Sequence, residues 1–216
     1  MYKTDREYRT MELRAAEATD EKSYVVEGYA TTFGDSYELF RDGNYIVMET
    51  VDKDAFKNTD MSDVVFMIDH EGRVFARTRN ESLKLDIDEH GLKTRTDLGL
   101  TAASREVYEA IDAGLYDRMS FAFTVTKDRY EEEEKDDGSV ILTRTILEVG
   151  KLYDVSAVSF PANPNTDISA RTKELIDGEI KKSVTERLHA KELNEKRAAV
   201  RDTIKSILEV KTDETD

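Results

Sequence analysis

The stretch "KLYDVSAVSFPANPNT", residues 151–166, places a strand-like run directly before the only two prolines of the chain. The run is apolar and β-branched, and it contains one acid, Asp154. Before this stretch, short segments with period-two alternation predict strands; after it, the apolar residues take a helical spacing. The stretch therefore predicts both the last strand and a boundary between a first domain, residues 1–166, and a tail, residues 167–216.

The first domain is dominated by short strand-like segments. They are "YVVEGYATTF" (24–33), "VVFMI" (64–68), "SLKLDID" (82–88), "LKTRTDL" (92–98), "SFAFTVT" (120–126), "VILTRTILEV" (140–149) and "LYDVSAVSF" (152–160). One helix is predicted among them at residues 100–115, with Thr101 or Ser104 as its N-cap and Gly114 at its end. This order predicts a mainly β protein with helices (α+β), folded as a closed or nearly closed antiparallel β-barrel.

The tail has a helical pattern. An apolar residue recurs every four positions, and a similar stripe continues further on: Ile176, Ile180, Val184 and Leu188, then Val200, Ile204 and Ile207. Charged residues fill the positions between them, so we expect an acidic, amphipathic helical tail. Its apolar seam needs a partner, which is the barrel, another helix or a second copy of the chain.

Composition limits the classes of function. The chain has 216 residues, a net charge of −15 and no cysteine. The negative charge argues against binding to nucleic acid or to an anionic membrane surface. Disulfides, thiolate metal sites and cysteine nucleophiles are excluded, no secretory signal is recognisable, and no run is long enough to span a bilayer. We expect neither a metal nor a cofactor.

Two acidic segments are predicted to be solvated turns. The run "YEEEEKDDGS", residues 130–139, is predicted to be an exposed hairpin loop, because blocks of like charge repel one another and stay hydrated. The segment "DIDEHG", residues 86–91, imitates half of a calcium-binding EF-hand loop. An EF-hand needs a helix on each side, whereas strands flank this segment, so a β-turn closed by Gly91 is expected.

The stretch "VVFMIDHEGR", residues 64–73, runs an apolar strand into His70, one of three histidines. His90 falls in the predicted turn and His189 on the tail helix, where solvated side chains are expected. A strand can end on a histidine without any role for it. A general base held at the rim of a rigid sheet is the alternative that the downstream residues favour.

Alternation places a serine opposite the core. In "LYDRMSFAFTV", residues 115–125, Met119, Phe121 and Phe123 point one way and identify the core face. Ser120 therefore points to the opposite face. On this pattern alone, a serine on a solvated strand face is the simpler interpretation.

An acid inside an apolar strand costs free energy unless it is paired or hydrogen-bonded. Asp154 is such an acid, and His70 is the histidine that follows an apolar strand. A histidine, Ser120 and an acid in a chain without cysteine fit nucleophilic acyl transfer. The chain lacks the HExxH pattern of zinc proteases and the GxSxG elbow of α/β-hydrolases.

The chain resembles the prohead (capsid-maturation) proteases of tailed bacteriophages over about residues 10–166. The resemblance rests on "VEGYATTFG", an apolar strand ending in "DHE", "LKLDIDEHGLKTRTDL", a helix, "GLYDRMSFAFTV" and "LYDVSAVSFPANPNT". The most specific parts are "RMSFAF" and "YDVSAVSFPANP". Such proteases are serine peptidases related in fold to the herpesvirus assembly protease, a β-barrel surrounded by helices. The resemblance implies His70 as the base, Ser120 as the nucleophile and Asp154 as the third triad member.

Two departures from the family pattern leave alternatives open. The hairpin between the serine and Asp154 is longer than the family pattern, and Glu148 lies closer to Ser120 in sequence, so Glu148 is a competing triad acid. Where the herpesvirus enzymes carry a pair of arginines, this chain has Ala162 and Asn163. The candidate oxyanion donors are therefore backbone amides, either of the "PANP" loop or of the "YDRMS" turn.

The resemblance implies a protease that acts inside an assembling procapsid in the host cytoplasm. Its substrates would be the scaffold, or the scaffolding segment of the major capsid protein, and the protease itself. Self-association through the tail is expected. An inactive or fused scaffolding protein of the phage head is the first alternative, and a cation-binding β-module that uses the acidic loops is the second.

Overall fold

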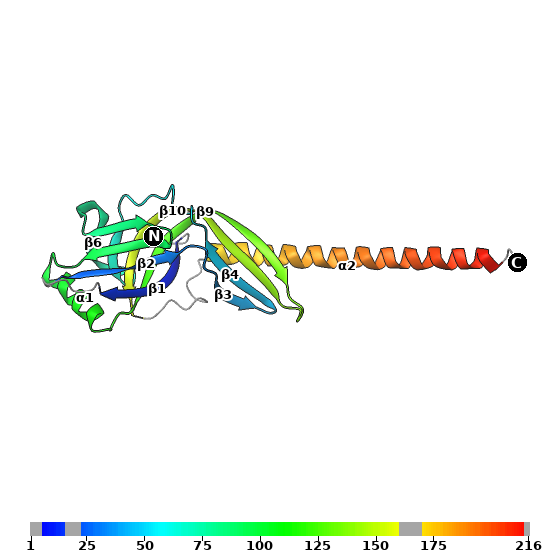
Figure 1. Ribbon diagram of the computed structural model, residues 1–216, viewed down its shortest axis with the longest axis horizontal. Coiled ribbons are helices and arrows are strands. Elements are labelled where there is room, and N and C mark those ends of the chain that lie inside the picture. Colours follow the sequence, from blue (N-terminus) through cyan, green and yellow to red (C-terminus); the bar gives the residue numbers. More distant parts are fainter. Residues whose placement is uncertain (1–5, 16–22, 160–169, 214–216) are drawn as a thin grey trace. The chain divides into compact units, whose positions relative to one another are not determined.

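The computed structural model describes residues 6–15, 23–159 and 170–213. The chain divides into two compact units, Met1–Lys173 and Glu174–Asp216. The strands are β1 (Glu7–Ala15), β2 (Val25–Thr32), β3 (Tyr37–Asp42), β4 (Tyr45–Val51), β5 (Val65–Ile68), β6 (Glu71–Arg77), β7 (Leu83–Ile87), β8 (Gly91–Asp97), β9 (Arg118–Glu134) and β10 (Val140–Val158) (Figure 1). The helices are α1 (Ala102–Asp112), α2 (Ala170–Asp213) and the single-turn 3₁₀ helix η1 (Thr78–Asn80).

The strands form one ten-stranded sheet whose main path is β3-β4-β10-β9-β1-β2-β8-β7. Most neighbours are antiparallel. One edge of β10 pairs with β9, while its other edge pairs in parallel with β4 along Val140–Ile146 and with β5 along Asp154–Ala157. Because β10 is 19 residues long, it serves two partners on the same edge, and β5 and β6 branch from it there.

The predicted mainly β, α+β class is confirmed, but the described strands are not closed into a barrel. The path ends at β3 and β7, β6 pairs only with β5, and α1 and α2 are the only α-helices in the described ranges, so helices do not surround the sheet. Alternation predicts where a strand lies and which face it buries, but it does not identify the neighbouring strands. The change of partner along β10 could not be predicted from it.

The β9–β10 hairpin is longer and more regular than predicted. Residues Glu131–Glu134 were expected in a loop, but they belong to β9 and pair with the first residues of β10. The turn is shorter, and Gly138 takes a positive φ of 79° in it. The four glutamates are exposed, as expected, although Val140 and Leu142, which pair with two of them from β10, are buried.

Two predicted strands, at residues 140–149 and 152–160, are parts of the single strand β10. Their junction is irregular, because the register against β9 shifts repeatedly between Ile146 and Asp154. These shifts are β-bulges, which bend a strand and change which face a residue occupies. A Cβ at Gly150 would meet Thr126 Cγ2 at 2.6 Å, so the close approach of β9 favours glycine here.

Two local predictions are confirmed. Thr101 caps α1, since its hydroxyl accepts a hydrogen bond from the Ser104 N–H at 3.0 Å, and Gly114 follows the helix with a φ of 74°. The segment "DIDEHG" ends β7 and forms a β-turn at residues 88–91, in which the Asp88 N–H donates to the Gly91 carbonyl at 3.0 Å.

The strands β1, β3, β4 and β6 were not predicted. In β1 and β4 the missing signal has a physical cause, because charged residues occupy buried positions. Glu7 and Arg9 of β1 and Glu49 of β4 are each less than 10% exposed, and so is Arg144 of β10, with which they interact. Alternation of apolar and polar residues fails as a guide wherever a strand buries charge.

These four side chains form a buried network of ion pairs across three strands. Arg144 Nη1 lies 2.7 Å from Glu7 Oε2 and 2.9 Å from Glu49 Oε2, and Arg9 binds the same two carboxylates at 2.7 Å and 2.5 Å. Burial alone would lower the pKa of the Arg144 guanidinium. The hydrogen bonds and charges of Glu7 and Glu49 outweigh that effect and raise this pKa above its ordinary value.

The helix α2 is continuous over 44 residues. Among the side chains of α2 that the structure describes, the exposed large apolar ones are Val184, Leu188, Leu193 and Val200. The side chains of Ile204 and Ile207, and the predicted domain boundary after residue 166, lie outside the described residues. No helix in the described ranges is both long enough and apolar enough to cross a membrane.

Candidate active site

A two-residue turn presents His70. It joins β5 to β6, with Ile68 paired to Glu71 across the hairpin. Asp69 and His70 both take positive φ values, 50° and 58°, as a type I′ turn requires. Aspartate and histidine adopt this left-handed region more readily than most residues. His70 therefore lies just past the end of the strand, in a tight turn with little freedom.

The turn is fastened to the end of β10. The Asp69 N–H donates to the Ala157 carbonyl at 3.0 Å. The Asp69 carboxylate accepts hydrogen bonds from both the backbone N–H and the hydroxyl of Ser159, at 2.8 and 2.7 Å. The position of His70 is thereby fixed relative to the strand that carries Asp154.

His70 and Asp154 form a hydrogen-bonded pair. His70 Nδ1 lies 2.5 Å from Asp154 Oδ1, and the two side chains are 16% and 3% exposed. The ring of Tyr8, from β1, packs edge-on against the imidazole with 4.5 Å between the ring centroids. The sequence-based pairing of this buried acid with His70 is confirmed, and the remaining ring nitrogen, Nε2, is free of that bond.

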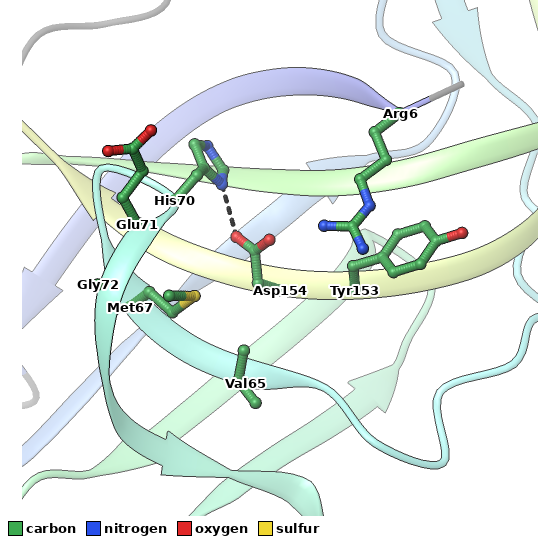
Figure 2. A pocket seen from close by; sticks show the side chains of 8 residues that line it. All are labelled: Arg6, Val65, Met67, His70, Glu71, Gly72, Tyr153 and Asp154. Carbon is green, nitrogen blue, oxygen red and sulfur yellow. Dashed lines mark hydrogen bonds and ion pairs between the residues drawn. The ribbon is translucent and has the colours of Figure 1, made fainter. Parts of the chain in front are cut away.

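An open cavity of about 460 Å³ contains this pair. It is lined by Arg6, Val65, Met67, His70, Glu71, Gly72, Tyr153 and Asp154. Figure 2 shows the imidazole and the Arg6 guanidinium on either side of the Asp154 carboxylate. The guanidinium lies 3.7 Å over the centre of the Tyr153 ring. The histidine–aspartate pair is therefore reached from a hollow that has both polar and apolar walls.

Ser120 lies on β9, the neighbour of β10, directly opposite Ser156 and two positions along from the partner of Asp154. The expectation of a solvated face was wrong, since Ser120 is 1% exposed. Its hydroxyl is buried and has no hydrogen-bond partner in the part of the chain that the structure describes. Ser120 is thus on the sheet next to the pair, but no hydrogen bond joins it to His70 there.

The competing acid, Glu148, lies apart from the pair. Glu148 accepts a hydrogen bond from the Thr126 hydroxyl at 2.9 Å, on an exposed part of the hairpin. The structure brings Asp154, and not Glu148, to His70. Ala162 and Asn163 lie outside the described residues.

The prediction from sequence did not identify Ser156 as part of this site. Its hydroxyl donates to Asp154 Oδ1 at 2.8 Å, and the residue is fully buried. A signal was present, because Ser156 follows Asp154 by two positions and so shares its face of the strand. Nothing in the sequence indicated that Tyr8 and Arg6 belong to the site, because the strand β1 was not predicted.

No group of three or more possible metal ligands is found within the described ranges. A hydrogen-bonded histidine–carboxylate pair beside a serine, in a chain without cysteine, is the residue set of a serine hydrolase.

Comparison with protein families gives the particular class of serine hydrolase. The family model of the caudovirus prohead serine protease matches residues 9–179. The chain belongs to this family, and it is therefore a serine peptidase of phage prohead maturation. The match extends past residue 166, where the predicted domain ended, into α2. Comparisons with curated proteins and with solved structures found no match.

Proposed function

We propose that the chain is a serine endopeptidase that cleaves the scaffold, or the scaffolding segment of the major capsid protein, and also itself. We assign His70 as the general base, Ser120 as the nucleophile and Asp154 as the acid that orients the base. The observation that carries the assignment is the 2.5 Å hydrogen bond between His70 and Asp154 at an open cavity. The family supports the role in capsid maturation.

The reaction follows from the hydrogen-bonding state of His70. With Nδ1 bonded to Asp154, Nε2 takes the proton of the Ser120 hydroxyl as its oxygen attacks the carbonyl carbon of the scissile peptide bond. Asp154 stabilises the resulting imidazolium. The imidazolium then gives the proton to the leaving amine, and water hydrolyses the acyl-enzyme by the same base.

The burial of Ser120 affects how a substrate reaches it. Because the residue is 1% exposed, a polypeptide gains access to its hydroxyl only after neighbouring side chains move. The negative charge that develops on the substrate oxygen needs donors, for which we propose backbone amides of Ala162 and Asn163 or of the turn before Ser120.

We further propose that the protease works inside the procapsid, in the host cytoplasm, and that α2 carries contacts with the scaffold or with a second copy. Three apolar side chains of this highly charged helix, Val184, Leu188 and Leu193, are between 41% and 64% exposed. A long helix with an exposed apolar seam is typical of segments that associate with another helix.

Co-expression with the matching major capsid protein tests the proposal. Mass spectrometry of all fragments is expected to show a shortened capsid protein and a shortened protease with the unchanged chain. Both products should be missing with Ser120→Ala. Full processing by Ser120→Ala would exclude Ser120 as the nucleophile, and an intact capsid protein with the unchanged chain would contradict the proposed substrate.

A further inference from the structure

Asp154 Oδ1 accepts two hydrogen bonds, one in the pair with His70 and one from a side chain of its own strand. His70 Nδ1 lies at 2.5 Å and the Ser156 hydroxyl at 2.8 Å. Asp154 and Ser156 are 2% and 0% exposed. In this dry environment a hydrogen bond to a carboxylate is stronger than in water, and its loss is not replaced by solvent.

The second hydrogen bond restricts the carboxylate. An aspartate side chain rotates about two bonds, so a single bond to His70 leaves several orientations of the carboxylate plane open. Ser156 lies two residues further along β10 and therefore on the same side of the strand, within reach of the same oxygen. Its short side chain has one rotatable bond before the hydroxyl, which makes it a rigid donor.

The position of Ser156 in the sheet also matters. It is paired directly with Ser120 on β9, while Asp154 is paired with Ala122. Residues directly opposite on neighbouring strands have Cβ atoms about 4.5–5.5 Å apart. Ser156 is therefore a direct neighbour of both the proposed nucleophile and the carboxylate, and its own proton is donated to Asp154.

We propose that Ser156 is a positioning residue of this site: its hydroxyl holds the Asp154 carboxylate in the orientation that accepts a hydrogen bond from His70 Nδ1–H. This inference rests on the proposed function, since it assigns Asp154 a part in catalysis. Ser156 does not touch the substrate and acts only through Asp154.

A double-mutant cycle tests the inference without knowledge of the cleavage sequence. A fluorophosphonate probe reacts with an activated serine, and mass spectrometry locates the adduct. We expect Ser156→Ala to slow labelling of Ser120 about tenfold, equivalent to about 1.4 kcal/mol. In the Asp154→Asn background the same change should alter the rate by less than about twofold, because the group through which Ser156 acts is already altered.

A matched control separates this effect from a general loss of stability. Ser104 is equally buried, at 1%, and its hydroxyl donates to the Phe75 carbonyl at 3.1 Å, outside the site. In the Ser104→Ala variant, the fluorophosphonate should label Ser120 at the same rate as in the unchanged chain. A histidine Nδ1–H that is hydrogen-bonded to a carboxylate gives a proton NMR signal at low field. We expect this signal of His70 to be lost in the Ser156→Ala variant and kept in the Ser104→Ala variant.

The outcomes are distinct. If Ser156→Ala labels at the full rate, or slows labelling equally in both backgrounds, Ser156 does not act through Asp154 and the inference is wrong. If the unchanged chain shows no adduct on Ser120, the proposed function itself fails. Should Ser156→Ala not fold, Ser156→Thr keeps the hydroxyl, and loss of the His70 signal in that folded variant would overturn the inference.

Discussion

At the scale of single residues, Ser120 combines burial with an unsatisfied hydroxyl. A buried polar group without a partner costs about 1–3 kcal/mol, and such groups in native proteins call for a reason. Ser120 is one of three side chains in the described ranges with a buried polar atom in this state. A nucleophile whose hydrogen-bonding capacity is kept for the reaction supplies such a reason.

This state predicts the effect of Ser120→Ala on stability. Removing a hydroxyl that makes no hydrogen bond takes away a desolvation cost, so the free energy of unfolding should be unchanged or increase by up to about 1 kcal/mol. Urea denaturation measures it. Ser104→Ala, which removes the donor of a buried hydrogen bond, should instead lose about 1 kcal/mol. A comparable loss in Ser120→Ala would mean that its hydroxyl has a partner.

Asp154 and Glu148 differ in a second test. A triad aspartate changed to its amide keeps its shape but favours the wrong histidine tautomer, a loss of up to about 10⁴-fold in a serine protease triad. We expect Asp154→Asn to lose most of its peptidase activity. Glu148→Gln should keep at least about a tenth, a margin of about 1.4 kcal/mol, because Glu148 bonds to Thr126 and not to His70. Both variants are assayed on one peptide at neutral pH, and the reverse order would make Glu148 the acid.

The sequence predicts the pair of His70 and Asp154 for a physical reason. A charged side chain in an apolar strand needs a partner. Because the chain has three histidines, few histidines are available as that partner. The burial of Ser120 was not predictable in this way. Alternation correctly gives the side of β9 on which its hydroxyl lies, but it cannot tell whether other side chains cover that side.

At the scale of elements, β10 organises the site. Its bulges between Ile146 and Asp154 change the phase of the strand, so two acids that share a face by simple counting have different surroundings. A glycine inside a strand, such as Gly150, is compatible with a bulge, but the sequence does not tell where the strand leads after it. Pairing partners depend on the whole fold, which explains why strands were predicted better than the sheet.

The buried ion network predicts a large effect of a change far from the serine. Arg144→Met would leave Glu7 and Glu49 with one arginine between them in a buried site. Removing one member of a buried ion pair costs about 3–5 kcal/mol. We expect a loss of that size in urea denaturation. Because Glu7 lies next to Tyr8, which packs on His70, labelling by fluorophosphonate should fall as well.

The control for this change is Arg41→Met. Arg41 pairs with Glu38 on β3, but the two side chains are 61% and 40% exposed. An exposed pair contributes little, so this variant should unfold at the urea concentration of the unchanged chain. If Arg144→Met and Arg41→Met lowered the free energy of unfolding in urea equally, the ion-pair network of Arg144 would not be buried in solution.

At the scale of the whole molecule, charge is distributed unevenly between the two parts. Residues 167–216 contain 12 acidic and 11 basic residues, so the tail is nearly neutral and the expectation of an acidic tail was wrong. Almost the whole net charge of −15 therefore lies in the first 166 residues. A neutral helix with mixed charges does not repel a second copy, which supports the proposed self-association.

The division into units predicts the result of a truncation. The first unit carries the apolar core, including Phe56, Phe66 and Leu152, whereas the exposed apolar residues of α2 form only a stripe. A chain ending at Lys182 keeps all of the family match, which ends at residue 179. We expect this chain to fold, to remain soluble and to label at Ser120 with the rate of the full chain.

Its incorporation into procapsids should fall, because the exposed apolar residues of α2 that we assign to scaffold contacts all follow Lys182 and are gone. Gradient-purified procapsids assembled with full-length or truncated protein measure this, both in the Ser120→Ala background so that proteolysis does not remove the tail first. Equal incorporation would assign the assembly contacts to the first unit. An insoluble truncated chain would show instead that α2 beyond residue 182 contributes to the core, because an apolar surface left uncovered by the deletion would drive aggregation.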